Sequence, residues 1–344
     1  MINTFSFTDK FRLSFVSGGE PFYDFRTLID IIDFFSLFFK NHKKELKIWI
    51  CTNGTLINEE QIRQLDFYNI QIGISQDGEK GIHDRCRVNK NGQGTYDIIR
   101  NNVADIINKE DLSQRIRKVW GSAVITAKGE GFLATLLEHK RLGFTNSQLR
   151  LVQISKENSL AFHYSDLNKI YEWIDELFQF IEDELINGKF EITGMLLNEN
   201  DYMGKILRRL ILHKNYIKRC QAGRLHRSFT PEGDIYPCDS FIGIEQFKLG
   251  NVLTGENKVF INKSVLEREN CKNCWIRFVC GGDCYYNSFC CNNDPFVPDN
   301  IFCCVMEYTV KTALYMLNNV KKQNKSIIQE LSRIQEVRDN LLYS

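Results

Sequence analysis

Seven cysteines in the C-terminal part of the chain have the residue type and the spacing to bind a soft metal. Thiolates are the ligands that zinc and iron–sulfur clusters take from proteins. One structural zinc ion needs only four ligands, so seven thiols exceed a zinc site and fit two four-iron clusters better. The candidate ligands are Cys220, Cys238, Cys271, Cys274, Cys280, Cys284 and Cys303, with Cys304 as the alternative to the last.

The composition of the whole chain limits the classes of function. Lys and Arg number 44 and Asp and Glu 43, and this balance predicts no nucleic-acid partner. There is no run of 18 apolar residues, so we expect no membrane span. The first residues, MINTFSFTDKFR, have no apolar signal-peptide core and predict a cytoplasmic protein. The cytosol keeps thiols reduced, so the twelve cysteines favour metal over a disulfide framework.

A second group of polar residues follows three predicted strands. Gly18, Gly19, Glu20 and Pro21 come after the first strand, Asn53 after the second, and Ser75 and Asp77 at the end of the third. Glycines let the backbone approach a ligand closely, and Glu20 can accept hydrogen bonds from an ammonium group.

Strands and helices alternate through the first half of the chain, which predicts a parallel sheet with right-handed crossovers. Ligands of such sheets lie at the carboxyl ends of the strands, where these polar residues fall. The predicted strands are residues 11–16, 46–51, 70–75, 119–126 and 148–154. The predicted helices are residues 27–40, 58–65, 95–108, 131–142, 167–187 and 201–216.

We expect four parts. Residues 1–195 form the α/β part, residues 196–219 a helical connector, residues 220–305 a small cysteine-rich domain, and residues 306–344 closing helices. The cysteine-rich part has little apolar periodicity, so we expect it to depend on metal for its stability.

In their order and spacing these motifs resemble the radical S-adenosylmethionine (SAM) enzymes with a C-terminal SPASM domain, of the peptide- or sulfatase-maturating type. The resemblance implies a partial (β/α) barrel that lacks its first strand and helix, joined to an iron–sulfur domain. It also implies S-adenosylmethionine as cofactor. The residues that would contact this cofactor are Gly18, Gly19, Glu20, Pro21, Asn53, Ser75, Asp77 and Arg87.

Arg87 belongs to His83-Asp84-x2-Arg87, which resembles the HDxxR segment of the family. The alternative is a structural clamp in which Asp84 pairs with Arg87. Gly92-x-Gly94 resembles the loop that follows.

The resemblance also implies two auxiliary 4Fe–4S clusters. Cys271, Cys274, Cys280 and Cys303 would bind one, and Cys220, Cys238 and Cys284 the other. The second of these groups is one ligand short. His213 or His226, a water or a carboxylate could complete it, or the position is open to a substrate thiolate. Cys290 and Cys291 are weaker candidates for ligands.

Asp239 follows Cys238 directly. In the sulfatase-maturating branch an aspartate at this place acts as the base in oxidising a Cys or Ser side chain, which makes Asp239 the candidate catalytic residue. The alternative is a cap on the following turn.

The family cleaves S-adenosylmethionine at a cluster held by C-x3-C-x2-C, and this chain has no such motif; its first cysteine is Cys51. We therefore expect a truncated member that is inactive as given, or the product of a decayed gene. The parent activity would be radical-based oxidation of a peptide or protein, by crosslinking or by formylglycine formation, with a reductant such as ferredoxin or flavodoxin. Small-molecule dehydrogenation is a further possibility, and a non-catalytic peptide-binding or electron-transfer module is the alternative of a different class.

Overall fold

The computed structural model describes residues 8–16, 18–68, 70–107, 119–198 and 201–333. The chain divides into two compact units. The first comprises Met1–Val124 and Ala134–Leu149, and the second Ile125–Leu133 and Arg150–Ser344. Within the described residues, no helix is both long and apolar enough to cross a membrane.

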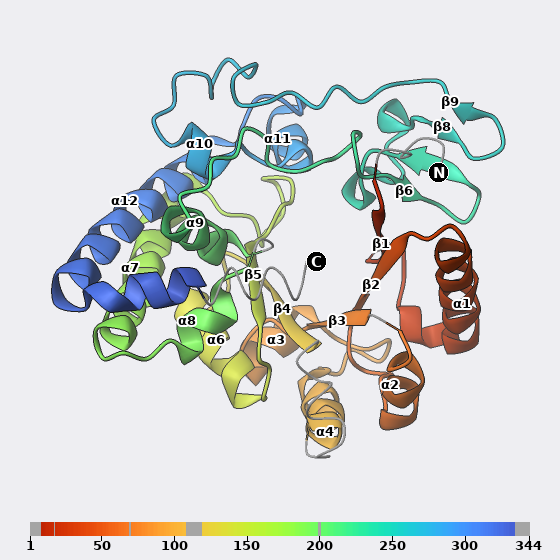
Figure 1. Cartoon of the computed structure of the whole chain (residues 1–344), viewed down its shortest axis with the longest axis horizontal. Coiled ribbons are helices and arrows are strands. Elements are labelled where there is room, and N and C mark those ends of the chain that lie inside the picture. The colour runs from red at the N-terminus through yellow and green to blue at the C-terminus, as the bar shows by residue number, and fades with distance from the viewer. Residues whose placement is uncertain (1–7, 17, 69, 108–118, 199–200, 334–344) are drawn as a thin grey trace. The chain divides into compact units, whose positions relative to one another are not determined.

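A curled, five-stranded sheet in the order β1-β2-β3-β4-β5 confirms the expected partial barrel (Figure 1). Successive pairs from β1 to β4 are parallel. The fifth strand ends at Leu151, earlier than the predicted residue 154. Just beyond this end, Val152 N donates a hydrogen bond to the carbonyl oxygen of Ile125, the last residue of β4. The strands are β1 (Lys10–Phe15), β2 (Glu45–Thr52), β3 (Ile70–Ser75), β4 (Val119–Ile125) and β5 (Ser147–Leu151).

Helices cover one face of this sheet, and their ends follow the local sequence. Ile32 and Phe39 of the first helix are buried, as are Ile50 and Ile74 of the strands. Asn58 and Gln61 form the capping box that starts the second helix, as an Asn cap predicts. The third helix was not predicted. The helices are α1 (Phe25–Asn41), α2 (Glu59–Leu65), α3 (Lys80–Cys86), α4 (Tyr96–Ile107) and α6 (Phe132–Arg141).

The second unit includes four further helices, of which one (Glu191–Leu196) was not predicted and two have bounds that differ from prediction. The helix expected over residues 201–216 ends at Ile211, because His213 takes a φ of 50°. The closing helix, expected from residue 306, starts at Asn300 after the Asp299 cap, so it includes Cys303. The four are α7 (Leu167–Ile186), α8 (Glu191–Leu196), α9 (Tyr202–Ile211) and α12 (Asn300–Gln323).

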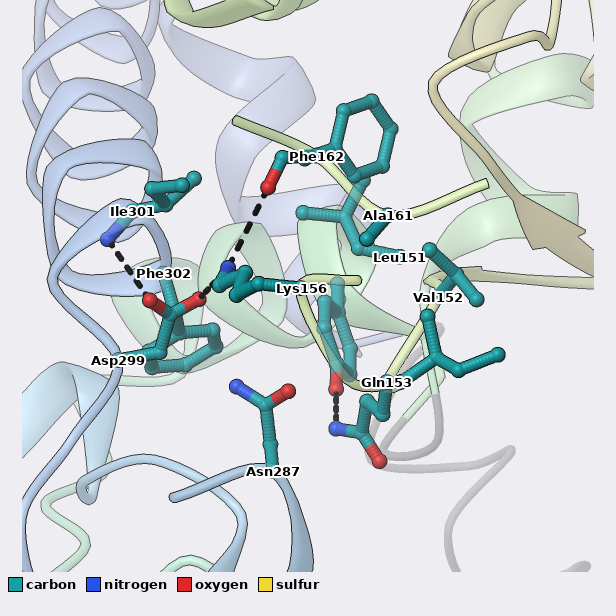
Figure 2. Close-up of a pocket in the computed structure, with 12 residues that line it drawn as sticks. Leu151, Val152, Gln153, Lys156, Ala161, Phe162, Asn287, Asp299, Ile301 and Phe302 are labelled. Atoms are coloured by element: carbon teal, nitrogen blue, oxygen red, sulfur yellow. Dashed lines mark hydrogen bonds and ion pairs between the residues drawn. The ribbon is translucent and has the colours of Figure 1, made fainter. Parts of the chain in front are cut away.

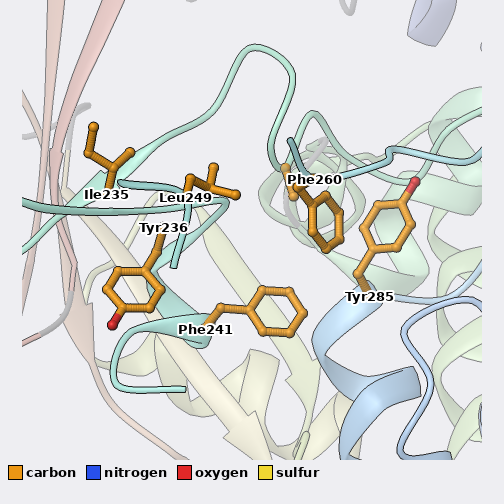
Figure 3. Close-up of a cluster of buried hydrophobic side chains, with 7 residues drawn as sticks. Ile235, Tyr236, Phe241, Leu249, Phe260 and Tyr285 are labelled. Carbon is orange, nitrogen blue, oxygen red and sulfur yellow. The ribbon is translucent and has the colours of Figure 1, made fainter. Parts of the chain in front are cut away.

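The cysteine-rich part has its own apolar core (Figure 3). Phe241 is fully buried, with its ring 4.1 Å from that of Phe247 and 5.7 Å from that of Phe260. These aromatic residues come from turns and very short strands. Their spacing in the sequence therefore shows neither the helix nor the strand period that would predict burial. The elements are the antiparallel strands β6 (Ser228–Phe229), β7 (Asp234–Tyr236), β8 (Gly250–Asn251) and β9 (Gly255–Glu256), with helices α10 (Arg277–Cys280) and α11 (Tyr285–Asn292).

Candidate functional site

The Glu20 carboxylate ties the glycine loop to the end of β2. It accepts hydrogen bonds from Thr52 Oγ1 at 2.6 Å, from Asn53 N at 2.7 Å and from Phe22 N at 3.1 Å. All three partners are donors, so the ionised form of Glu20 matches its surroundings. The sequence analysis anticipated the acceptor role but not these partners.

Gly18 and Gly19 precede Glu20 with φ angles of 88° and 135°. A Cβ added to either would meet no atom within 4 Å. Conformation rather than space therefore demands glycine here, and the backbone of the loop stays open to a ligand. Ser17, in the same motif, lies outside the described residues.

Asn53 folds the loop after β2. Its Oδ1 accepts from Thr55 N at 2.9 Å and from Thr55 Oγ1 at 2.7 Å, while Asn102 Nδ2 donates to Gly54 O at 2.9 Å. Gly54 has a φ of 75°, and a Cβ there would lie 2.8 Å from Ile74. The Asn53 carbonyl oxygen thus serves the loop itself.

Asp77 is the most constrained of the candidate residues beyond β3. Its carboxylate accepts from Arg87 Nε at 2.5 Å, from Arg87 Nη2 at 3.2 Å and from Val124 N at 2.9 Å. Asp84 instead accepts from Tyr96 N at 2.8 Å, at the start of α4. The alternative clamp between Asp84 and Arg87 is therefore wrong. Ser75 Oγ lies 3.9 Å from Cys51 Sγ.

Two buried histidines support this edge of the sheet. His83 Nδ1 accepts from Asp77 N at 3.2 Å, and its Nε2 faces Thr95 Oγ1 at 3.0 Å. His139 Nε2 donates to Gln76 O at 2.8 Å. Burial lowers the pKa of both, that of His139 to about 4, so both are neutral at pH 7. The sequence analysis did not single out His139.

Three thiols, named here the first thiol set, lie close to one another: Cys220, Cys238 and Cys284. Burial raises the pKa of the Cys238 thiol, and Asp239, Cys284 and Cys220 raise it further. Burial likewise raises the pKa of Cys284 to about 11, with Cys220 the next cause. His213 and His226, which we considered as a further ligand, are both exposed.

The second thiol set is Cys271, Cys274, Cys280 and Cys303. Burial raises the pKa of Cys303, and after Asp283 the other three thiols of the set raise it further. Cys304 lies elsewhere, where it accepts a hydrogen bond from Tyr171. The last two cysteines of the chain, adjacent in the sequence, thus have different neighbours.

Seven thiols in two sets exceed the four ligands of a single zinc ion. Among the described residues, no three His, Cys, Asp or Glu side chains surround one metal position. In a four-iron cluster each thiolate binds a different iron, which allows wider spacing. The raised pKa values of five of these thiols mean that their thiolates would need a nearby cation, which iron would supply if bound; the five are Cys238, Cys271, Cys280, Cys284 and Cys303. Neither Cys290, bonded to Tyr286, nor Cys291, 4.0 Å from Asn287, joins a set.

Arginines, which the sequence analysis missed, lie around both sets. Arg209 donates to Cys280 O at 3.1 Å. Arg219 lies with its guanidinium 4.6 Å from the Tyr202 ring, and its buried Nη1 has no hydrogen-bond partner in the described part of the chain. Their positions next to cysteines, at 219 beside 220 and at 268 before 271, are the signal that could have identified them.

Asp239 opens a short 3-10 turn, Asp239–Phe241, directly after Cys238. It is half-buried, and its carboxylate has no hydrogen-bond or ion-pair partner among the residues that the structure describes. Its backbone oxygen accepts from Ile242 N at 3.1 Å, which is the turn itself. The side chain therefore does not act as a cap on this turn.

The second unit also contains a pocket, which the sequence did not predict (Figure 2). Lys156 crosses it, with Nζ 3.0 Å from Asp299 Oδ2 and 3.3 Å from Phe162 O. Gln153 donates to the Tyr202 hydroxyl on another wall. Apolar walls with a few polar groups are typical of small binding sites. The lining residues are Leu151, Val152, Gln153, Ile154, Lys156, Ala161, Phe162, Tyr202, Asn287, Asp299, Ile301 and Phe302.

Comparison with known proteins gives curated relatives, although no protein-family model matches the chain. A cysteine-type anaerobic sulfatase-maturating enzyme of Clostridium novyi is 28% identical over 308 residues, 83% of this chain and 76% of that enzyme. One from Clostridium perfringens is 25% identical over 335 residues, 88% of this chain and 83% of its own. A serine-type enzyme of Bacteroides thetaiotaomicron is 23% identical over 267 residues, covering 70% and 61%.

Solved structures show a similar fold. Native anSMEcpe with bound AdoMet aligns with a TM-score of 0.67 at 19% identity, covering 90% of this chain and 85% of that one. The same protein with AdoMet and the Kp18Cys peptide aligns with a TM-score of 0.62 at 20% identity, covering 90% and 86%.

Proposed function

Because this chain is homologous to anaerobic sulfatase-maturating enzymes, which are radical SAM proteins of the SPASM type, we propose that it is an iron–sulfur protein of a peptide- or protein-maturating system. Its proposed parent activity is radical-based oxidation of a peptide side chain. The observation that carries the proposal is the grouping of seven thiols into two sets, one around Cys238 and one around Cys303.

The proposed cofactor site lies in the first unit. The Glu20 carboxylate receives the ammonium group of S-adenosylmethionine alongside its three protein donors. Gly18 and Gly19 keep the backbone open there. Asp77, fixed by Arg87 and by Val124 N, faces the nucleoside side of the cofactor together with Ser75. Asn53 and Pro21 shape the loops around it.

The proposed cluster ligands lie in the second unit, in the first and second thiol sets. When bound, four-iron clusters supply one-electron transfer. In this scheme Asp239 accepts a proton from the substrate side chain as that side chain is oxidised. Its unpaired carboxylate beside Cys238 supports this role. A reductant such as ferredoxin or flavodoxin is the proposed electron-transfer partner.

The sequence contains no C-x3-C-x2-C, and we propose that this chain by itself does not cleave S-adenosylmethionine. The test is anaerobic reconstitution of the purified chain, followed by iron and sulfide analysis and a 5′-deoxyadenosine assay. We expect about eight irons per chain, from two four-iron clusters, and no 5′-deoxyadenosine. One tightly held zinc without sulfide would refute the cluster proposal, and reductant-dependent 5′-deoxyadenosine would refute the inactivity.

The lack of C-x3-C-x2-C in this sequence also fits a second candidate function, that of a non-catalytic module that binds a peptide or transfers electrons. The two candidates separate when an N-terminal fragment carrying the three-cysteine motif is added. Turnover of S-adenosylmethionine and peptide in the mixture supports the maturase, whereas peptide binding without turnover supports the module.

A further inference from the structure

Arg268 is a charged side chain in the interior of the second unit. It is 2% exposed, and its guanidinium carbon lies 4.1 Å from the centre of the Tyr285 ring, itself part of the core in Figure 3. Its Nη1 donates to Asp283 O at 3.0 Å. Its Nε and Nη2 are buried and have no hydrogen-bond acceptor among the described residues.

Burying a guanidinium with unpaired donors destabilises the folded chain unless an anion or another acceptor binds those donors. A buried guanidinium loses its hydration, and one hydrogen bond to a carbonyl leaves most of its donors unpaired. The Tyr285 hydroxyl donates to Lys263 O at 2.7 Å and is not a partner of Arg268 Nε or Nη2 either. The geometry therefore calls for an acceptor that the side chains described here do not supply.

The second thiol set contains a residue that is close to Arg268 along the chain. Cys271 N donates to Arg268 O at 2.9 Å, so the arginine lies one turn before this thiol.

The loop between Cys280 and Cys284 encloses the same guanidinium. Gly282 has a φ of 92°, and a Cβ there would lie 3.3 Å from Arg268 Nη1. Only a glycine lets the loop approach so closely in this conformation. The arginine is therefore held between Cys271 and the Gly282 loop.

We propose that Arg268 is a positioning residue that donates hydrogen bonds from Nε and Nη2 to sulfur atoms of the cluster at the second thiol set and makes this cluster easier to reduce. Reduction adds one negative charge to a cluster, and a fixed cation in a dry site stabilises that charge. Hydrogen bonds to the sulfurs act in the same direction. The inference rests on the proposed function only for the presence of clusters.

The experiment uses the full chain, reconstituted anaerobically with iron and sulfide. We compare the parent with Arg268→Lys, which keeps the charge but loses the planar donors, and with Arg268→Gln, which loses the charge. Arg227→Lys is the control, because Arg227 pairs with Glu256 through Nε at 2.6 Å and through Nη2 at 3.1 Å, with no thiol involved. Iron content and a dithionite titration followed by EPR give the midpoint potential of each cluster.

We expect one of the two midpoints to become more negative in Arg268→Lys and more negative still in Arg268→Gln. The other midpoint, and both midpoints of Arg227→Lys, stay at the parent values. Loss of half the iron in Arg268→Gln, with retention in Arg268→Lys, also supports the proposal, because rescue by another cation identifies charge as the cause. Equal iron loss in both variants indicates packing alone and overturns it.

Unchanged midpoints in variants that keep their full iron would also overturn the inference while leaving the proposed function intact. If the parent chain itself assembles no clusters, the proposed function fails first. The two failures are therefore distinguishable in one set of samples.

Discussion

The Arg87 guanidinium holds the Asp77 carboxylate through two hydrogen bonds, from Nε at 2.5 Å and from Nη2 at 3.2 Å. Asp84 is much closer to Arg87 in the sequence but caps α4 instead. Gly94 permits this, since a Cβ there would lie 2.0 Å from the Asp84 carboxyl carbon. The two charged residues of the HDxxR segment thus have different roles. Asp84 caps the start of α4, and Arg87 holds the Asp77 carboxylate at the edge of the sheet.

Replacing Arg87 by Lys should lower the free energy of unfolding by about 1–3 kcal/mol, because a bidentate, partly buried pair becomes a single contact. Urea titration at pH 7 measures the loss. Arg63→Lys is the matched control; Arg63 forms an exposed pair with Glu59 on α2, and about 0.5 kcal/mol or less is expected there. Equal losses of unfolding free energy in the two variants would show that burial of the pair between Arg87 and Asp77 does not add to its stabilising effect.

Replacing Glu20 by Gln places an amide among three donors, so one N–H group will face another. We expect a loss of about 1–3 kcal/mol in the free energy of unfolding. Calorimetric titration should also show weaker binding of S-adenosylmethionine than in the parent. Glu60→Gln is the control, since the exposed Glu60 carboxylate accepts a hydrogen bond from Gln64 Nε2 on the surface of α2. Unchanged S-adenosylmethionine affinity in Glu20→Gln would remove Glu20 from the proposed site.

Stability should fall as the pH drops from about 6.5 to about 4. Burial lowers the pKa of His139 to about 4 from its ordinary 6.5, so in this window the unfolded chain binds a proton that the folded chain excludes. The full effect is on the order of 3 kcal/mol. His139→Gln, which can still donate to Gln76 O, should flatten the dependence, measured by urea unfolding at several pH values. His42→Gln, at the exposed end of α1, should keep the parent slope; a parent slope in His139→Gln would contradict the assignment.

Replacing Cys284 by Ser should reduce iron from about eight to about four per chain, because the first thiol set loses a ligand. Cys290→Ser, only one helix turn and a half along α11, should retain the parent iron content, because Cys290 bonds to Tyr286 instead. Iron and sulfide analysis after reconstitution makes the comparison. Similar losses of iron in both variants would mean that the first thiol set has been assigned to the wrong cysteines.

The sequence was sufficient for the sheet because each strand is a short apolar run with a loop after it. Residues 70–75 are the clearest case, predicted and found as β3. The cap of α2 was also predictable, since Asn58 and Gln61 act on neighbouring backbone. The closing helix was placed too late because the cysteines at 303 and 304 suggested a ligand loop, although the Asp299 cap precedes them.

Contacts between distant segments were not predictable in this way. The position of Arg268 before Cys271 does not by itself show that the arginine is buried, and His139 reaches Gln76 across 63 positions of sequence. The pair of Lys156 and Asp299 spans still more of the chain. Such partners depend on how elements pack, which periodicity does not encode.

The short loop from Cys280 to Cys284 begins in the second thiol set and ends in the first. Its residues also contact Arg268, through Asp283 O and Gly282. A deletion of one residue in this loop would shift the thiols of both sets at once. The geometry of one thiol set is therefore tied to that of the other through the length of this loop.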